Sequence, residues 1–202
     1  MKKIILLLIA LPALVFAQKT PPSFKGVPFG VGTSTFLSLY KPGGRWAERG
    51  GVPQVELNEA SRAVIVQPPN VSGVSMGQMY SATLQDSVAN VDAQIVLFFA
   101  IQSEQDFKLM KSGVTRALAE RALFSEVFAS FEARAFDHVF NATQARYGEP
   151  TQINSVIGIS EWDTPEVFVR LQAKYLKTGR CALTIKSKTV KSLANSSAAD
   201  QM

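Results

Sequence analysis

The chain has 202 residues, of which 47% are hydrophobic and 18% are charged, with 21 basic and 16 acidic side chains. This composition excludes a disordered tail, a collagen-like fibre and a small disulfide-stapled fold. The one cysteine cannot form an intramolecular disulfide, and the one histidine leaves little for a metal site or a catalytic triad. We therefore expect one globular domain, or two small fused subdomains, with no cofactor and no metal.

The first 17 residues have the pattern of a bacterial secretory signal. Two lysines follow Met1, an apolar stretch runs from Ile4 to Ala17, and polar sequence resumes at Gln18. The apolar stretch would form a helix about 21 Å long, short of the roughly 30 Å hydrocarbon core of a bilayer. We expect cleavage near Ala17, a periplasmic or secreted mature protein, and no transmembrane segment after cleavage. No cysteine follows the cleavage site, which excludes a lipid anchor there.

The first half of the mature chain begins with a helix and continues with strands. A short helix is expected from Thr33 or Ser34 to Tyr40, and the glycine- and arginine-rich residues 41–53 are expected to form a loop. A strand is expected at 62–67. Residues 79–88 and 91–100 form a predicted strand pair turning at Ala89-Asn90, because apolar residues alternate in the second strand.

The middle of the chain is predicted to be helical. Ser103 with Asp106 imitates a capping box, Gly113 is expected to end that helix, and Thr115 can cap the next. No glycine or proline occurs from there to Tyr147, and phenylalanines recur at helical spacing. This pattern predicts one long helix that ends at Gly148 and Pro150.

Three strands are expected after the helix, at 151–162, 167–175 and 180–188, and residues 192–202 are expected to be a flexible tail. The predicted fold class is therefore α+β, with an antiparallel sheet packed against one long helix in a single domain, 18–191. Both 24–100 and 103–191 run helix first and strands after, so two α-β-β-β halves remain an alternative.

Two segments of the chain have a pattern that is similar to that of a known class of proteins. One is Phe24-Lys-Gly-Val-Pro-Phe-Gly30, and the other is the helix ending Tyr147-Gly148-Glu149-Pro150 with the tryptophan-led strand and hairpin after it. The pattern resembles small exported bacterial α+β proteins, distantly like the SmpA/OmlA outer-membrane lipoproteins and the β-lactamase-inhibitor proteins. The resemblance implies a non-enzymatic protein that binds other proteins. The lipidated cysteine of the lipoproteins is missing, and no site residue is carried over.

Charge placement provides the first candidate binding surface. From Val167 to Ala199 there is no acidic residue. Strand alternation places Arg170 and Lys174 on one face of the terminal hairpin, and Lys186 and Lys188 on one face of its partner strand. Such a face would attract anions over about 8–10 Å. The alternative is a solvated face whose lysines prevent edge-to-edge strand pairing.

A tryptophan between arginines is the second candidate. Trp46 lies between Arg45 and Arg49, and tryptophan and arginine are both enriched at the energetic centres of protein interfaces. The alternative is a Trp46 that packs into the core, since tryptophan is well buried on average.

Acidic residues near Trp162 raise an enzymatic alternative. Glu161, Asp163 and Glu166 superficially match the carboxylate pair of a glycoside hydrolase, which lies about 5–9 Å apart across a sugar. Solvated carboxylates at a tight turn are the simpler interpretation. No catalytic residue is assigned.

The sequence therefore predicts a non-catalytic binding or adaptor protein of the bacterial cell envelope. Its expected partners are an envelope protein or an anionic envelope polymer, and no nucleic acid. The alternatives are an inhibitor or immunity protein that blocks another protein's active site, and an envelope hydrolase using the carboxylates near Trp162. The candidate binding residues are Arg45, Trp46, Arg49, Arg170, Lys174, Lys186 and Lys188.

Overall fold

The computed structural model describes residues 22–40, 45–49, 52–56, 63–67, 79–175 and 179–191. The expected leader and the expected tail lie outside these ranges. Within them, no helix has both the length and the apolar character needed to cross a bilayer.

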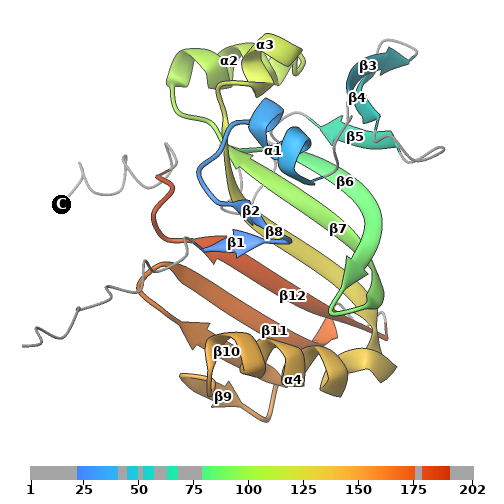
Figure 1. The fold of residues 1–202 in the computed structure, drawn as a ribbon, viewed down its shortest axis with the longest axis vertical. Coiled ribbons are helices and arrows are strands. Elements are labelled where there is room, and N and C mark those ends of the chain that lie inside the picture. The colour runs from blue at the N-terminus through green and yellow to red at the C-terminus, as the bar shows by residue number, and fades with distance from the viewer. Residues whose placement is uncertain are drawn as a thin grey trace, which may run out of the picture.

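A single sheet in which every neighbouring pair is antiparallel forms the body of the molecule (Figure 1). In the described part of the chain its strands lie in the order β3 (Arg45–Arg49), β4 (Val52–Glu56), β5 (Ala63–Gln67), β6 (Met79–Val88), β7 (Val91–Ala100), β8 (Leu123–Glu132), β12 (Arg180–Ser187), β11 (Val167–Tyr175), β10 (Ile159–Asp163) and β9 (Gln152–Asn154). A separate small hairpin pairs β1 (Ser23–Phe24) with β2 (Val27–Pro28).

The helices are α1 (Thr33–Tyr40), α2 (Glu104–Ser112), α3 (Arg116–Ala119) and α4 (Phe136–Tyr147), the last preceded by the 3₁₀ turn η1 (Ala133–Ala135). The predicted α+β class is confirmed. In Figure 1, α1, the β1–β2 hairpin and α4 all lie in front of the sheet. We call this side of the sheet the covered face, and the opposite side the far face.

Strand alternation explains why the core lies on the covered face. Ile95, Ala129, Leu183 and Leu171 stand opposite one another across β7, β8, β12 and β11, and all four are buried. Helix α1 adds Phe36, whose ring lies 4.8 Å from that of Phe124. Burial of these apolar side chains is the main term that holds the helices to the sheet.

The one long helix predicted for the middle of the chain is wrong. Its middle third is the central strand β8, paired on both sides. Val127, Ala129 and Phe131 follow the two-residue period of a strand and are buried on the covered face. A bulge at Ser125, whose hydroxyl donates to Phe98 O at 3.1 Å, shifts the register and turns Phe124 to the same face. Phe124 and Phe131 therefore share the covered face, whereas alternation places Phe128 on the far face.

Two further boundaries differ from the prediction. The expected loop at 41–53 contains the strand pair β3–β4. The expected strand at 151–162 is two strands, β9 and β10, separated by a tight turn. In that turn Gly158 has φ +65°, a conformation that side chains rarely adopt.

The locally encoded elements agree with the prediction. Strands β6 and β7 have the predicted bounds, and Ala89 and Asn90 in their turn have φ of 50° and 63°. Helix α4 ends at Gly148, φ 84°, as its sequence indicates. Gly113 ends α2.

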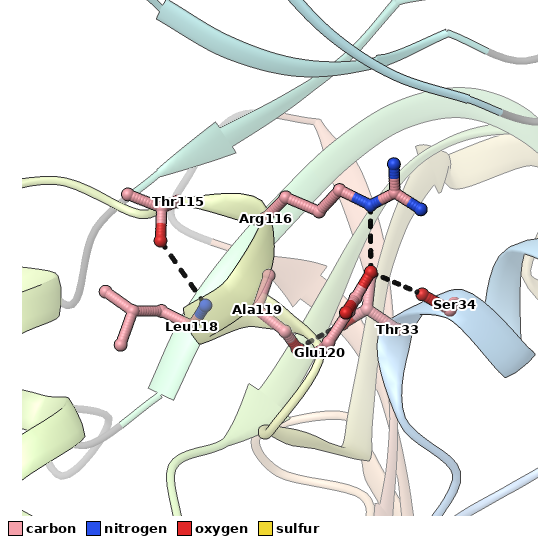
Figure 2. Close-up of polar contacts among 7 residues, drawn as sticks. All are labelled: Thr33, Ser34, Thr115, Arg116, Leu118, Ala119 and Glu120. Atoms are coloured by element: carbon pink, nitrogen blue, oxygen red, sulfur yellow. Dashed lines mark hydrogen bonds and ion pairs between the residues drawn. The ribbon is translucent and has the colours of Figure 1, made fainter.

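Side-chain contacts between α1 and α3 fix the upper end of the covered face (Figure 2). Thr33 Oγ1 donates to Ala119 O at 2.7 Å, and Ser34 Oγ donates to Glu120 Oε1 at 3.0 Å. The Arg116 Nε atom lies 2.8 Å from the same carboxylate oxygen, and its hydrogen bond lowers the pKa of Glu120. These contacts hold α1 against the strands that it covers.

Removing the cap of α2 is expected to cost about 1 kcal/mol of stability. Ser103 Oγ accepts from Asp106 N at 3.1 Å, which satisfies a backbone donor that has no partner within the helix. We expect Ser103→Ala to lower the free energy of unfolding by that amount in urea denaturation. The matched control is Ser112→Ala at the exposed other end of the helix, and an equal loss in both variants would contradict the capping role.

Candidate functional site

An open cleft of about 240 Å³ lies between the β1–β2 hairpin, helix α4 and the covered face of the sheet. Its apolar lining includes Val139 from α4 and Leu183 and Ile185 from β12, which are at most 4% exposed. Phe24 and Val88 close the sides. The floor of the cleft is therefore aliphatic.

Helix α4 is held over this floor by contacts at both ends. At its first turn, His138 Nε2 hydrogen-bonds Ala89 O at 2.8 Å. Farther along, Phe140 packs on Trp162 with ring centroids 5.7 Å apart. At its end, Trp162 Nε1 donates to Gly148 O at 2.8 Å. The helix is thus fixed to a turn and to β10, and the cleft lies beside it.

Two cations and a phenol line the cleft. Arg146 lies at the exposed end of α4, where Nη2 donates to Ser23 O at 2.6 Å and the guanidinium lies 5.4 Å from the centre of the Tyr147 ring. Burial raises the pKa of Tyr147, which keeps its phenol protonated. Lys25, in the β1–β2 turn, is the second cation, with 31% of its side chain exposed.

Lys25 is neutralised by a partly buried carboxylate. Its Nζ lies 2.8 Å from Asp86 Oδ1, which also accepts from Ser87 N at 2.7 Å, and the other carboxylate oxygen accepts from the Tyr40 hydroxyl. Burial alone would raise the pKa of Asp86, but the bonds from Lys25, Tyr40 and Ser87 outweigh it and bring the pKa from 3.8 to about 2. Asp86 is therefore ionised at neutral pH.

Arg146 has no such counter-charge. Within the described residues no carboxylate pairs with it, and of its five N–H donors only those of one nitrogen are engaged with Ser23. The cleft therefore offers an apolar floor, one balanced ion pair and one cation with free donors. This arrangement suits an amphipathic anion: the chain packs on the floor and the charged end lies near Arg146.

The hydroxyl and thiol near this region are engaged in backbone bonds. Thr143 Oγ1 donates to Val139 O at 2.7 Å inside α4. Cys181 is buried in the sheet, its Sγ donates to Ala173 O at 2.9 Å, and burial raises the pKa of its thiol. Neither group is activated as a nucleophile.

Two of the predicted basic residues lie on the far face, away from the cleft. Arg170 of β11 projects there, and Lys186 of β12 projects on the same side, where it stands opposite Phe168. A register shift between Gln172 and Tyr175 interrupts the alternation of β11 before Lys174. Lys188 follows the end of β12. The common side expected from alternation holds for Arg170 and Lys186, and whether any of the four cations binds a partner stays a prediction.

Carboxylates compensate most of this positive charge. Arg170 Nε lies 2.7 Å from Glu161 Oε1, and Lys188 is ion-paired with Asp163. Lys186 stands opposite Glu126 in the β12–β8 register; burial raises the pKa of Glu126 and Lys186 opposes that rise. Lys174 is exposed, and no described carboxylate pairs with it.

Arg45, Trp46 and Arg49 are separated from the far-face cations by the sheet itself. They lie in β3, the strand at one edge, and five strands stand between β3 and β12. In the β3–β4 register Trp46 stands opposite Val55. Their side chains lie outside the part of the chain that the structure describes. The two candidate surfaces do not form one site.

The carboxylates near Trp162 do not form a sugar-binding pair with it. Trp162 is buried on the covered face, whereas Glu161 and Asp163, its neighbours in β10, project to the far face. Each of these two carboxylates is paired with a cation. The geometry gives the hydrolase alternative no support.

Sequence reasoning missed Lys25, Asp86, Arg146 and Tyr147. Their elements are distant in the chain, and no spacing rule links a hairpin turn, a strand and a helix end. The sequence contained one partial signal for the cleft. The two segments that carry the family resemblance contain Phe24, Lys25 and Tyr147, which line the cleft.

Comparison with known proteins adds no relative: no family model, no curated protein and no solved structure matches this chain. The cleft is therefore interpreted from its own chemistry.

Proposed function

We propose that this chain is an exported, non-catalytic binding protein of the bacterial cell envelope that holds a small amphipathic anion in the cleft. The leader would be removed near Ala17, and the mature protein would act in the periplasm. The observation that carries the proposal is the meeting of the Val139–Leu183–Ile185 floor with Arg146 in one open cleft.

The size of the cleft limits the ligand. Its volume of about 240 Å³ lies below the roughly 300–1,000 Å³ of sites for drug-sized molecules, so a short chain or one end of a longer molecule fits. Binding would remove apolar surface of the ligand from water, at roughly 25 cal/mol per Å². The ionised Asp86 repels an anion from the Lys25 side, so the charged group would lie nearer Arg146.

Blocking the cleft tests the proposal. Ala142 lines the cleft from the exposed side of α4, so Ala142→Phe would fill its mouth without removing a polar contact. We expect decanoate to bind the wild-type protein, and Ala142→Phe to weaken this binding at least about tenfold in isothermal titration calorimetry.

Ala145→Phe is the matched control, since Ala145 is exposed on the same helix and does not line the cleft. Decyltrimethylammonium, with an equal chain and the opposite charge, should bind much more weakly than decanoate. Equal binding of the two amphiphiles, or equal effects of the two alanine variants, would refute the anion site.

The far face remains a proposed surface for an acidic envelope protein or an anionic polymer, as an adaptor would need. Its support is the pair of cations Arg170 and Lys186 on one side of the sheet, together with the exposed Lys174 and Lys188. Replacing all four cations, Arg170, Lys174, Lys186 and Lys188, by glutamate should abolish capture of that partner from an envelope extract. One-to-one recovery of a single enzyme in the same experiment would instead identify an inhibitor.

A further inference from the structure

Exposed aliphatic side chains are concentrated on the β9–β10 hairpin. Ile153 is 62% exposed, Val156 93% and Ile157 53%. We call these three residues the apolar tip. In the described part of the chain, five large hydrophobic residues are at least 49% exposed. Three of the five are the residues of the apolar tip, which lie within positions 153–157. Single exposed apolar residues are ordinary on protein surfaces, whereas a cluster marks a contact site.

The hairpin holds the tip in a fixed, outward position. Asn154 Oδ1 accepts from Ile157 N at 3.3 Å, and Gly158 O accepts from Ala173 N at 2.8 Å. Gly158 approaches β11 so closely that a Cβ there would lie 2.9 Å from Ala173 Cβ. In Figure 1 the hairpin is at the lower edge of the molecule, with β9 outermost. The aliphatic side chains therefore cannot fold back onto the core without breaking these contacts.

A cation accompanies the tip. Lys174 follows Ala173, whose N–H bonds Gly158 O, so its backbone lies near the turn of the hairpin. Lys174 is exposed and unpaired with any described carboxylate, and residues 150–158 contain no charged side chain. An aliphatic protrusion with a nearby cation and no charged side chain within its own turn complements an anionic surface over an apolar layer.

We propose that the apolar tip inserts into the surface of an anionic phospholipid bilayer, with Lys174 against the headgroup phosphates. The energetic centres of protein interfaces are enriched in tryptophan, tyrosine and arginine, and the three residues of the tip are aliphatic instead. Aliphatic side chains on a protrusion suit the boundary between headgroups and acyl chains. This contact is separate from the cleft and does not depend on its ligand.

Vesicle co-sedimentation tests the contact. The probes are vesicles of phosphatidylcholine alone and of phosphatidylcholine mixed with phosphatidylglycerol. We expect the wild-type protein to bind the mixed vesicles, and Val156→Ser combined with Ile157→Ser to weaken that binding at least about tenfold. Lys174→Glu should weaken binding a few-fold to the mixed vesicles only. Mass spectrometry must first show that residues 1–17 are absent, because that apolar stretch would itself bind a bilayer.

Leu109→Ser is the matched control, since Leu109 is 49% exposed on α2, away from the hairpin. It should leave vesicle binding unchanged, and circular dichroism should show that every variant is folded. No binding by the wild-type protein, or equal binding by the tip variant, would overturn the proposal. So would a dimer seen by sedimentation velocity that the tip variant abolishes, in the absence of vesicle binding, because the tip would then join two copies of the chain.

Discussion

Replacing Trp162 by alanine is expected to lower the free energy of unfolding by about 3–5 kcal/mol. Trp162 is 1% exposed, packs against Phe140 of α4, and donates from Nε1 to Gly148 O. The variant would leave a large cavity between β10 and the helix, and would remove the bond that fixes the helix end. Urea denaturation followed by circular dichroism measures the loss.

Two further variants separate the contribution of the hydrogen bond from that of packing and provide a control. Trp162→Phe keeps an aromatic ring against Phe140 and removes the indole donor, so loss of the hydrogen bond to the Gly148 carbonyl should cost about 0.5–1.5 kcal/mol. Ile157→Ala, at an exposed position, should change stability by less than about 0.5 kcal/mol. A Trp162→Ala protein as stable as the Ile157→Ala protein would show that α4 does not depend on this contact.

Acidification is expected to remove roughly 2 kcal/mol of stability through Asp86 alone. The pKa of this carboxyl is about 2 in the folded protein, below its ordinary value of 3.8. Between these values the unfolded chain binds the proton more readily, so stability falls as the pH falls from about 4 to 2. Above pH 4 the contribution is fully present.

Asp86→Asn isolates this contribution. The free energy of unfolding of the variant should be lower than that of the wild-type protein at pH 6, and the gap should shrink towards pH 2. Tyr40→Phe removes one of the bonds that lower the pKa and should shift the loss to higher pH. A gap between Asp86→Asn and wild type that stays constant from pH 6 to pH 2 would contradict the assignment.

The sequence predicted elements whose signals are local. The β6–β7 pair, the caps of α2 and α3, the stop of α4 and the terminal strands all depend on residues within a few positions of one another. Capping hydroxyls, turn residues and alternation act over that range, and each is visible without knowledge of the rest of the chain.

Strand β8 and the cleft could not be predicted in this way. Phe124, Phe128 and Phe131 fit helical spacing, and only pairing with β7 and β12 makes the segment a strand. Asp86 carried no signal for a binding site either, because its partners Lys25 and Tyr40 come from the β1–β2 turn and α1. Tertiary contacts determine both the strand conformation of β8 and the composition of the cleft. Strand formation depends in general on neighbouring strands.

The middle position of β8 has a consequence for how the chain reaches its final form. Ser130 of β8 and Arg180 of β12 are hydrogen-bonded although 50 positions apart, so one side of β8 has no sheet partner until the C-terminal strand arrives. Closing so long a loop slows folding, and an apolar strand with an unsatisfied edge can meanwhile join another molecule. We expect refolding yield to decline with protein concentration, and newly made chains to need protection by a chaperone until the last strand is in place.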